Sequence, residues 1–141
     1  MKIVIGSDHA GFYLKQFIIE HFTKLFTFED VGTFSSESVD YPDFAHPLAK
    51  LVSEGKFGKA ILICGSGNGV AMTANKHPHV RAALCWSEEI AQLARLHNDA
   101  NVLVLPARFI TKDHAIKIID VFFNTPFEGG RHQNRVNKVN L

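Results

Sequence analysis

The chain has 141 residues, the length of one compact domain, and its 46% hydrophobic and 21% charged residues are ordinary for a globular protein in water. A formal net charge of +1 gives no overall field that would attract nucleic acid or an anionic membrane, so we expect neither partner. No apolar stretch approaches the roughly 18 residues that a membrane-spanning helix needs.

Short apolar runs alternate with helical patterns along the chain. The runs are KIVIG (2–6), TFEDV (27–31), AILIC (60–64), AALCW (82–86) and NVLVL (101–105). The first run is soon interrupted by Gly6 and Asp8, which predicts a buried strand rather than a signal peptide. Nearly continuous apolar strands separated by helices predict one α/β domain over 1–141, with a parallel sheet covered on both faces.

Capping residues predict where two of the helices begin. Ser87 precedes a segment that opens with two glutamates and runs to His97, and acids are favoured in a first helical turn. Thr111 precedes KDHAIKIIDVFF, which Pro126 ends. The stretches Gly32–Asp43 and 126–141 are the least regular parts of the chain.

Polar residues follow the first and third predicted strands. Asp8 and His9 come after the first strand, and the loop Gly65-Ser66-Gly67-Asn68-Gly69 comes after the third. Ligands of open parallel sheets bind at the carboxyl ends of strands, where the strand order reverses. If these strands are neighbours at that reversal, both polar segments line one crevice. A carboxylate there accepts hydrogen bonds from sugar hydroxyls, and an imidazole binds phosphate or moves protons.

The loop at 65–69 carries three glycines in five residues between a strand and a helix. Strand-to-helix turns often contain one glycine, but three favour a loop whose N–H groups face an anion or an oxyanion. The loop is a poor nucleotide motif, because it lacks the Lys-Ser/Thr pair of a P-loop and Val70 stands where a dinucleotide motif has its third glycine.

Cys64 is the last residue of the third strand and lies directly before this loop. A thiol near a helix N-terminus or a cation forms a thiolate more readily, and a thiolate can act as a base. Cys85 lies inside an apolar strand, where we expect an inert core residue. The two cysteines have no CxxC spacing, which predicts free thiols, a reducing compartment and a cytoplasmic location.

Three further segments carry candidate residues. His97-Asn98-Asp99 closes a helix, and from the residues alone a C-cap with Asn98 ending the helix is slightly favoured over a functional role. Arg131 and Arg135 are four residues apart and could clamp a phosphate, although a solvated basic tail fits equally well. Arg108 adds a cation after the fifth strand. His77-Pro78-His79 has no HExxH or carboxylate partners, so no metal is expected.

Six segments in this order resemble the ribose-5-phosphate isomerase B family, which includes the galactose-6-phosphate isomerase subunits. They are GSDHAG, Asp40-Tyr41-Pro42, ICGSGNG, ANK, HND and GGRHQNR, and they extend over essentially the whole chain. The resemblance implies a Rossmann-like three-layer α/β/α sandwich with a five-stranded parallel sheet. It also implies a homodimer or homotetramer whose active sites are shared between subunits, with the tail 126–141 contacting the partner.

The resemblance also implies the reaction and the roles of the residues. Cys64 moves a proton between C2 and C1 of ribose 5-phosphate through a cis-enediolate, a step of the pentose phosphate pathway that needs no cofactor, and His97 opens the sugar ring. A branch of the family replaces the cysteine with a glutamate after the glycine loop, but Val70 is there instead. The implied substrate-binding residues are Asp8, His9, Gly65, Ser66, Gly67, Asn68, Gly69, Asn98, Arg108, Arg131 and Arg135, with Tyr41 and His132 as further candidates.

Two alternatives stay open. An allose-6-phosphate or galactose-6-phosphate isomerase differs in substrate by one CHOH unit, and the depth of the pocket is not readable from the sequence. A non-catalytic phosphosugar-binding subunit or sensor would keep the arginines and the glycine loop without the base. The presence of both Cys64 and His97 favours an enzyme.

Overall fold

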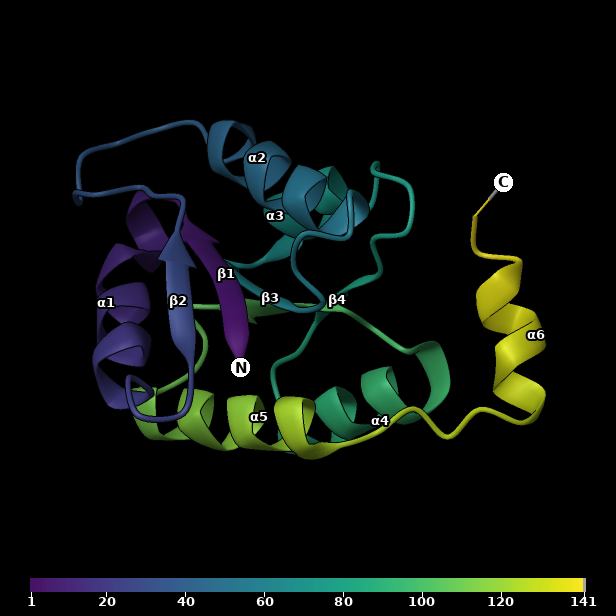
Figure 1. Ribbon diagram of the computed structural model, residues 1–141. Helices are drawn as coiled ribbons and strands as arrows, with labels where there is room; N and C mark the ends of the chain where they lie inside the picture. The colour runs from purple at the N-terminus through teal and green to yellow at the C-terminus, as the bar shows by residue number, and fades with distance from the viewer. Residues whose placement is uncertain (141) are drawn as a thin grey trace.

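The computed structural model describes residues 1–140, which form a parallel five-stranded sheet in the order β2-β1-β3-β5-β4 (Figure 1). The strands are β1 (Lys2–Ser7), β2 (Thr27–Asp30), β3 (Ala60–Cys64), β4 (Ala82–Leu84) and β5 (Val102–Pro106). All four neighbouring pairs run parallel. The predicted α/β class and the five-stranded parallel sheet are confirmed.

Helices cover both faces of this sheet (Figure 1). They are α1 (Phe12–His21), α2 (Pro42–Ser53), α3 (Asn68–Ala74), α4 (Glu88–Asn98), α5 (Lys112–Asn124) and α6 (Arg131–Asn137), with a short 3₁₀ turn η1 (His9–Gly11). Helices α1, α4 and α5 bury one face, and α2 and α3 bury the other. Helix α6 stands apart from the sheet and contacts α4.

The central strands are apolar along their whole length because both faces are covered. In β3, Ile61 and Ile63 face the core under α1 and α5, whereas Leu62 faces the core under α2 and α3. All three side chains are fully buried. This pattern matches a parallel sheet between two helical layers, so the three-layer sandwich is confirmed.

The predicted helix starts are confirmed by their caps. The Ser87 side chain accepts a hydrogen bond from the Ile90 N–H at 3.3 Å, and the Thr111 side chain accepts one from the His114 N–H at 3.1 Å. The end of α4 differs from the interpretation that Asn98 terminates it. The helix includes Asn98, and Asp99 ends it in the left-handed conformation with φ of 46°, which aspartate tolerates better than most residues.

The two least regular stretches contain more structure than their sequences suggest. Helix α2 begins at Pro42, inside the first stretch, with proline at the first helical position where its missing N–H costs nothing. Helix α6 lies in the C-terminal stretch. Its seven residues carry too few apolar positions for a periodic signal. The predicted strand at 82–86 is shorter, because β4 ends at Leu84.

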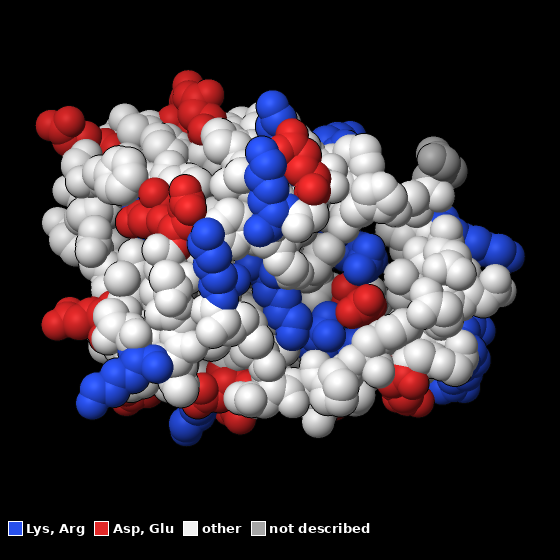
Figure 2. Space-filling view, in the orientation of Figure 1, with Lys and Arg blue, Asp and Glu red and all other residues white. Residues whose placement is uncertain are grey.

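Acidic and basic side chains are mixed over the face shown in Figure 2, with Lys and Arg gathered around a hollow beside the C-terminal segment. This mixture agrees with the small net charge of the chain. Among residues 1–140, no helix is both long enough and apolar enough to cross a bilayer.

Candidate active site

The strand order reverses between β1 and β3, because the chain continues from β1 to β2 on one side and to β3 on the other. The two strands pair directly, with Ser7 opposite Ile63. The polar segments that follow them therefore meet at one edge of the sheet, as the sequence predicted. This reversal is where open α/β sheets bind their ligands.

A cavity of about 330 Å³ lies at this edge. It is lined by Asp8, His9, Ala10, Tyr41, Cys64, Gly65, Ser66, Gly69 and Arg108. Eight of these residues were predicted as site residues, and Ala10 is the addition. The volume is at the lower end of the range for small-molecule sites, which is about 300–1,000 Å³.

Cys64 lies at the base of this cavity with only 5% of its surface exposed. Its Sγ accepts a hydrogen bond from the Gly67 N–H at 3.1 Å. This bond ties the sulfur to the turn at the start of α3. The Gly67 N–H is therefore engaged by the Cys64 sulfur.

The glycine loop needs its small residues for close packing. Gly67 has φ of 82°, a conformation that favours glycine. A Cβ at Gly69 would lie 2.5 Å from the Tyr41 ring, so this ring packs directly on the loop. The Asn68 N–H donates to Ser66 Oγ at 3.3 Å, and Asn68 itself lines an adjacent groove with Trp86 rather than the cavity.

Arg108 brings a cation to the mouth of the cavity. The backbone N–H of Arg108 donates to the Gly65 carbonyl at 3.0 Å, which holds the segment after β5 against the glycine loop. A Cβ at Gly65 would lie 3.1 Å from the Arg108 guanidinium. Glycine at this position therefore lets the guanidinium lie over the loop beside Cys64.

Asp8 and His9 are oriented by backbone groups. Asp8 is 8% exposed, and its Oδ1 accepts a hydrogen bond from the Gly11 N–H at 3.1 Å. The Val39 N–H donates to His9 Nδ1 at 3.1 Å. In a neutral ring the proton then lies on Nε2, so His9 can offer that N–H to an oxygen of a ligand.

Lys15 supports this edge of the sheet and was not predicted. Its side chain is fully buried, and its Nζ donates to Asp30 Oδ1 and to the Thr33 carbonyl, both at 2.6 Å. The Thr33 N–H in turn donates to the carbonyl of Ser7, the residue before Asp8, at 2.7 Å. Burial lowers the pKa of Lys15, and the Asp30 carboxylate opposes that shift. A lysine in a helix normally indicates an exposed position, so no sequence signal marked it.

Five of the remaining predicted residues line a different cavity. A pocket of about 390 Å³ is lined by His97, Asn98, Arg131, His132 and Arg135. None of them lines the cavity at Cys64. The structure thus brings the candidate residues together in two groups, with Cys64 in one and His97 in the other.

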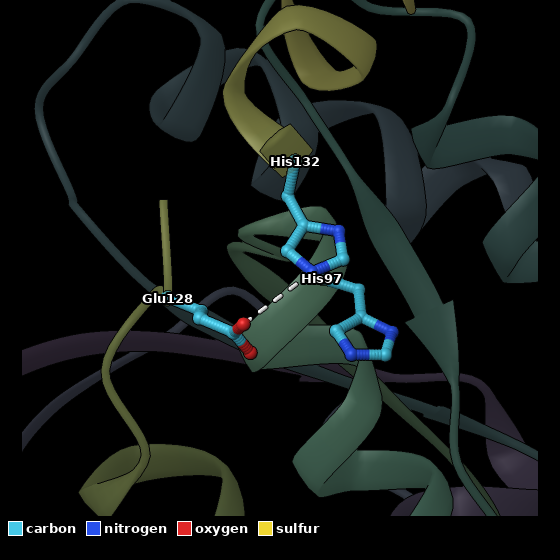
Figure 3. Close-up of side chains that lie close together, drawn as sticks. All are labelled: His97, Glu128 and His132. Carbon is cyan, nitrogen blue, oxygen red and sulfur yellow. Dashed lines mark ion pairs between the residues drawn. The ribbon is translucent and has the colours of Figure 1, made fainter. Parts of the chain in front are cut away.

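The end of α4 holds His97 in place. Asp99, which ends the helix, accepts a hydrogen bond from the largely buried Arg95 at 2.8 Å, and Arg95 also donates to the Ala100 carbonyl at 2.7 Å. The His97 ring stacks on the His132 ring, with centroids 4.3 Å apart and planes 14° apart (Figure 3). His97 therefore lies at a hydrogen-bonded helix end, against a residue of α6.

Glu128 belongs to this second group and was missed from the sequence. Its carboxylate lies 3.7 Å from His132 Nε2 (Figure 3). Burial and the charge of His97 lower the pKa of His132, and Glu128 opposes them. The spacing of four residues between Glu128 and His132 was the available signal, but Gly129 and Gly130 between them gave no helical pattern.

The two cysteines differ in their surroundings, and we expect iodoacetamide to modify Cys64 in the folded protein and to spare Cys85. Cys64 lines the cavity, whereas Cys85 is fully buried and its burial raises the pKa of the thiol to about 12. Peptide mass spectrometry should find one modified cysteine before unfolding in denaturant and two after it. Modification of Cys85 before Cys64 in folded protein would contradict this assignment.

Comparison with protein families identifies relatives of this chain. The family model described as Ribose/Galactose Isomerase matches residues 3–139. A protein named probable ribose-5-phosphate isomerase B from Mycoplasma genitalium is 49% identical over 98% of this chain and 93% of its own length. Ribose-5-phosphate isomerase B of Escherichia coli is 42% identical, again over 98% of this chain and 93% of its own length.

Solved structures that superimpose on this chain also carry the name ribose-5-phosphate isomerase. A ribose 5-phosphate isomerase from Thermotoga maritima superimposes with a TM-score of 0.96 and 46% identity, over 99% of this chain and 97% of that one. The structure of ribose-5-phosphate isomerase B from Mycoplasma genitalium, which contains bound ribulose-5-phosphate, gives a TM-score of 0.93 and 49% identity, over 98% and 93% of the two chains.

Proposed function

The chain belongs to the ribose/galactose isomerase family, and from this premise we propose that it interconverts ribose 5-phosphate and ribulose 5-phosphate. The observation that carries the proposal is Cys64 at the base of a polar cavity at the point where the strand order reverses. The Mycoplasma genitalium relative, with ribulose-5-phosphate bound, supports a phosphorylated sugar as the substrate class.

Cys64 is the base in this proposal. Its thiolate removes the proton from C2 of the open-chain aldose and returns it to C1, while the proton on O2 is lost and O1 gains one. The intermediate is a cis-enediolate, whose negative charge needs positioned donors. We assign the N–H groups of Gly65, Ser66 and Gly69 to this charge, since the Gly67 N–H is bonded to sulfur and the Asn68 N–H to Ser66.

Asp8, His9 and Arg108 orient the substrate. The Asp8 carboxylate accepts hydrogen bonds from sugar hydroxyls, and His9 donates its Nε2–H to the sugar or to the phosphate. Arg108 supplies a positive charge at the cavity mouth that binds the phosphate of the substrate. The Tyr41 ring on Gly69 forms a wall of the cavity, and positioned groups of this kind hold reacting atoms in the productive geometry.

The second group of residues completes the site from another subunit in this proposal. His97, Asn98, Arg131 and Arg135 line a separate pocket in their own chain, on helices that lie away from Cys64. Helix α6 stands apart from the sheet, so its outward surface is placed to reach a neighbour (Figure 1). A homodimer, or a tetramer of two such dimers, would bring this pocket over the cavity at Cys64 of the partner.

His97 opens the furanose ring by moving a proton between the ring oxygen and O1. We expect His97→Asn to slow turnover of the cyclic sugar much more than turnover of the open-chain fraction, because ring opening is a separate proton transfer. Rates measured under ring-opening-limited and substrate-limited conditions separate the two steps, with His114→Asn as the matched control elsewhere on the surface. Equal losses under both conditions would remove His97 from this role.

A hexose-6-phosphate isomerase is the second candidate, since the matching family model includes galactose isomerases. A non-catalytic subunit is disfavoured, because Cys64 and His97 are both present and each lines a pocket. We also propose a cytoplasmic location, since Cys64 and Cys85 are both free thiols.

The test is an isomerase assay with ribose 5-phosphate, allose 6-phosphate and galactose 6-phosphate, each with EDTA present. We expect turnover without added metal and the highest kcat/KM for ribose 5-phosphate. A higher kcat/KM for a hexose phosphate would assign the second candidate, and no turnover of any of the three would refute the enzyme.

A further inference from the structure

Three side chains with metal-binding atoms converge between α4 and α6 (Figure 3). They are His97 in the last turn of α4, His132 in the first turn of α6, and Glu128 in the segment before α6. One imidazole nitrogen of each histidine and one carboxylate oxygen all lie within 4.8 Å of one another. Of these three side chains, the proposed reaction uses only His97.

The buried side chain of His132 independently supports a bound ion at this cluster. It is only 7% exposed, and its Nε2 is buried without a hydrogen-bond partner among residues 1–140. The Glu128 carboxylate, at 3.7 Å, is too far away for a hydrogen bond. Buried polar atoms without a protein partner are rare in native proteins, and such an atom can be satisfied by a bound ion.

We propose that His97, Glu128 and His132 bind a divalent transition-metal ion, with zinc as the best-suited ion, and that this ion inhibits the isomerase. Two imidazoles and one carboxylate are a known ligand set for zinc, with a fourth position left for water. The binding claim concerns the cluster alone. The inhibition rests on the proposed function, because the ion would occupy the ring nitrogen of His97.

The cluster needs only side-chain movement to close around an ion. Zinc bonds of about 2.1 Å place tetrahedral ligand atoms about 3.4 Å apart. The three ligand atoms of the cluster now lie within 4.8 Å of one another, so they must move closer to bind the ion. His132 is buried, while His97 is partly exposed and the Glu128 side chain is 53% exposed, so both can turn toward it. The Glu128 N–H donates to the Leu96 carbonyl at 3.1 Å, which keeps these segments together.

Two features weaken binding at this cluster. The His97 and His132 rings are nearly parallel, so His97 must leave the stack to direct a nitrogen at the ion. Arg131 and Arg135 line the same pocket, and their charges repel a cation. We therefore expect reversible binding that is weaker than that of a structural zinc site, which suits an inhibitor better than a resident cofactor.

The test is zinc binding by equilibrium dialysis on untagged protein in phosphate-free buffer. The exposed pair His46 and His77, whose ring nitrogens lie 2.7 Å apart, could bind zinc separately, so the measurements use a His46→Gln background. We expect one zinc ion per chain. Glu128→Gln should weaken binding by at least about tenfold, whereas the matched control Glu37→Gln in an exposed loop should not. Equal affinity in both variants would overturn the site.

A Co²⁺ titration distinguishes this cluster from the thiol of Cys64. Nitrogen and oxygen ligands give visible d–d bands without the near-ultraviolet band of a cobalt–thiolate bond, and we expect these bands to persist in Cys64→Ala. A thiolate band that disappears in Cys64→Ala would overturn the assignment. Zinc should also inhibit isomerisation, less so in Glu128→Gln. Zinc binding that depends on Glu128 without any inhibition would keep the site and overturn the inhibition, and the dialysis result stands whatever the activity.

Discussion

Replacing Cys64 with alanine or serine is expected to lower the isomerisation rate by on the order of 10² to 10⁴, the usual contribution of a general base. A serine hydroxyl is too weak a base at neutral pH to replace the thiolate. The Cys64 side chain makes one hydrogen bond, with the Gly67 N–H, so the fold and substrate binding should remain nearly intact. Steady-state kinetics with ribose 5-phosphate, together with thermal unfolding, measure both effects.

Cys85→Ser is the matched control for this substitution. Cys85 is buried in the core and lines neither of the two site pockets, so any variant that folds should keep its turnover. A fully active Cys64→Ala variant, or a loss of activity in folded Cys85→Ser, would remove Cys64 from the role of base.

Mixing two inactive variants is expected to restore activity if the sites are shared between subunits. One variant carries Cys64→Ala, and the other carries Arg131→Ala together with Arg135→Ala. An Arg–phosphate hydrogen bond contributes roughly 1.5 to 3 kcal/mol, so losing two arginines should nearly abolish turnover at low substrate concentration. A heterodimer then has one site with both lesions and one intact site. Equimolar subunit exchange should therefore recover about a quarter of the wild-type activity, since half of the dimers are mixed.

The design needs proof of exchange and a control that cannot recover. Differently tagged variants allow the heterodimers to be purified and verified by mass spectrometry. In a mixture of Cys64→Ala with Cys64→Ser, both subunits lack Cys64. No site of a mixed dimer then has the base, so this mixture should stay inactive. If the arginines serve their own subunit, every site keeps one lesion. Verified heterodimers without activity would refute the shared site but not the isomerase.

The central sheet and the cavity were predictable because their signals are local. Helices cover both faces of β3, so Ala60–Cys64 is apolar at every position, and the strand ends where Cys64 meets the glycine loop. Ser87 and Thr111 act as caps through bonds to residues three positions away. The meeting of the β1 and β3 loops depended on the strand order, which the sequence left as a condition and which the structure shows.

The features that were missed depend on contacts between distant residues. Lys15 is buried only because Asp30 and Thr33 satisfy its ammonium group from another part of the chain. Glu128 and His132 become a cluster with His97 only when α6 packs against α4. The division of the candidates into two cavities likewise depends on where α6 lies, and no local pattern in the tail determines that position.

The most direct test of the central claim, that Cys64 moves the proton between C2 and C1, is isomerisation in D₂O followed by NMR. A base that exchanges its proton with solvent should introduce deuterium at C1 of ribulose 5-phosphate and at C2 of ribose 5-phosphate. We expect the wild-type protein to show this incorporation and Cys64→Ala to show almost none, even with substrate bound. Deuterium incorporation by Cys64→Ala at the wild-type rate would show that another group is the base.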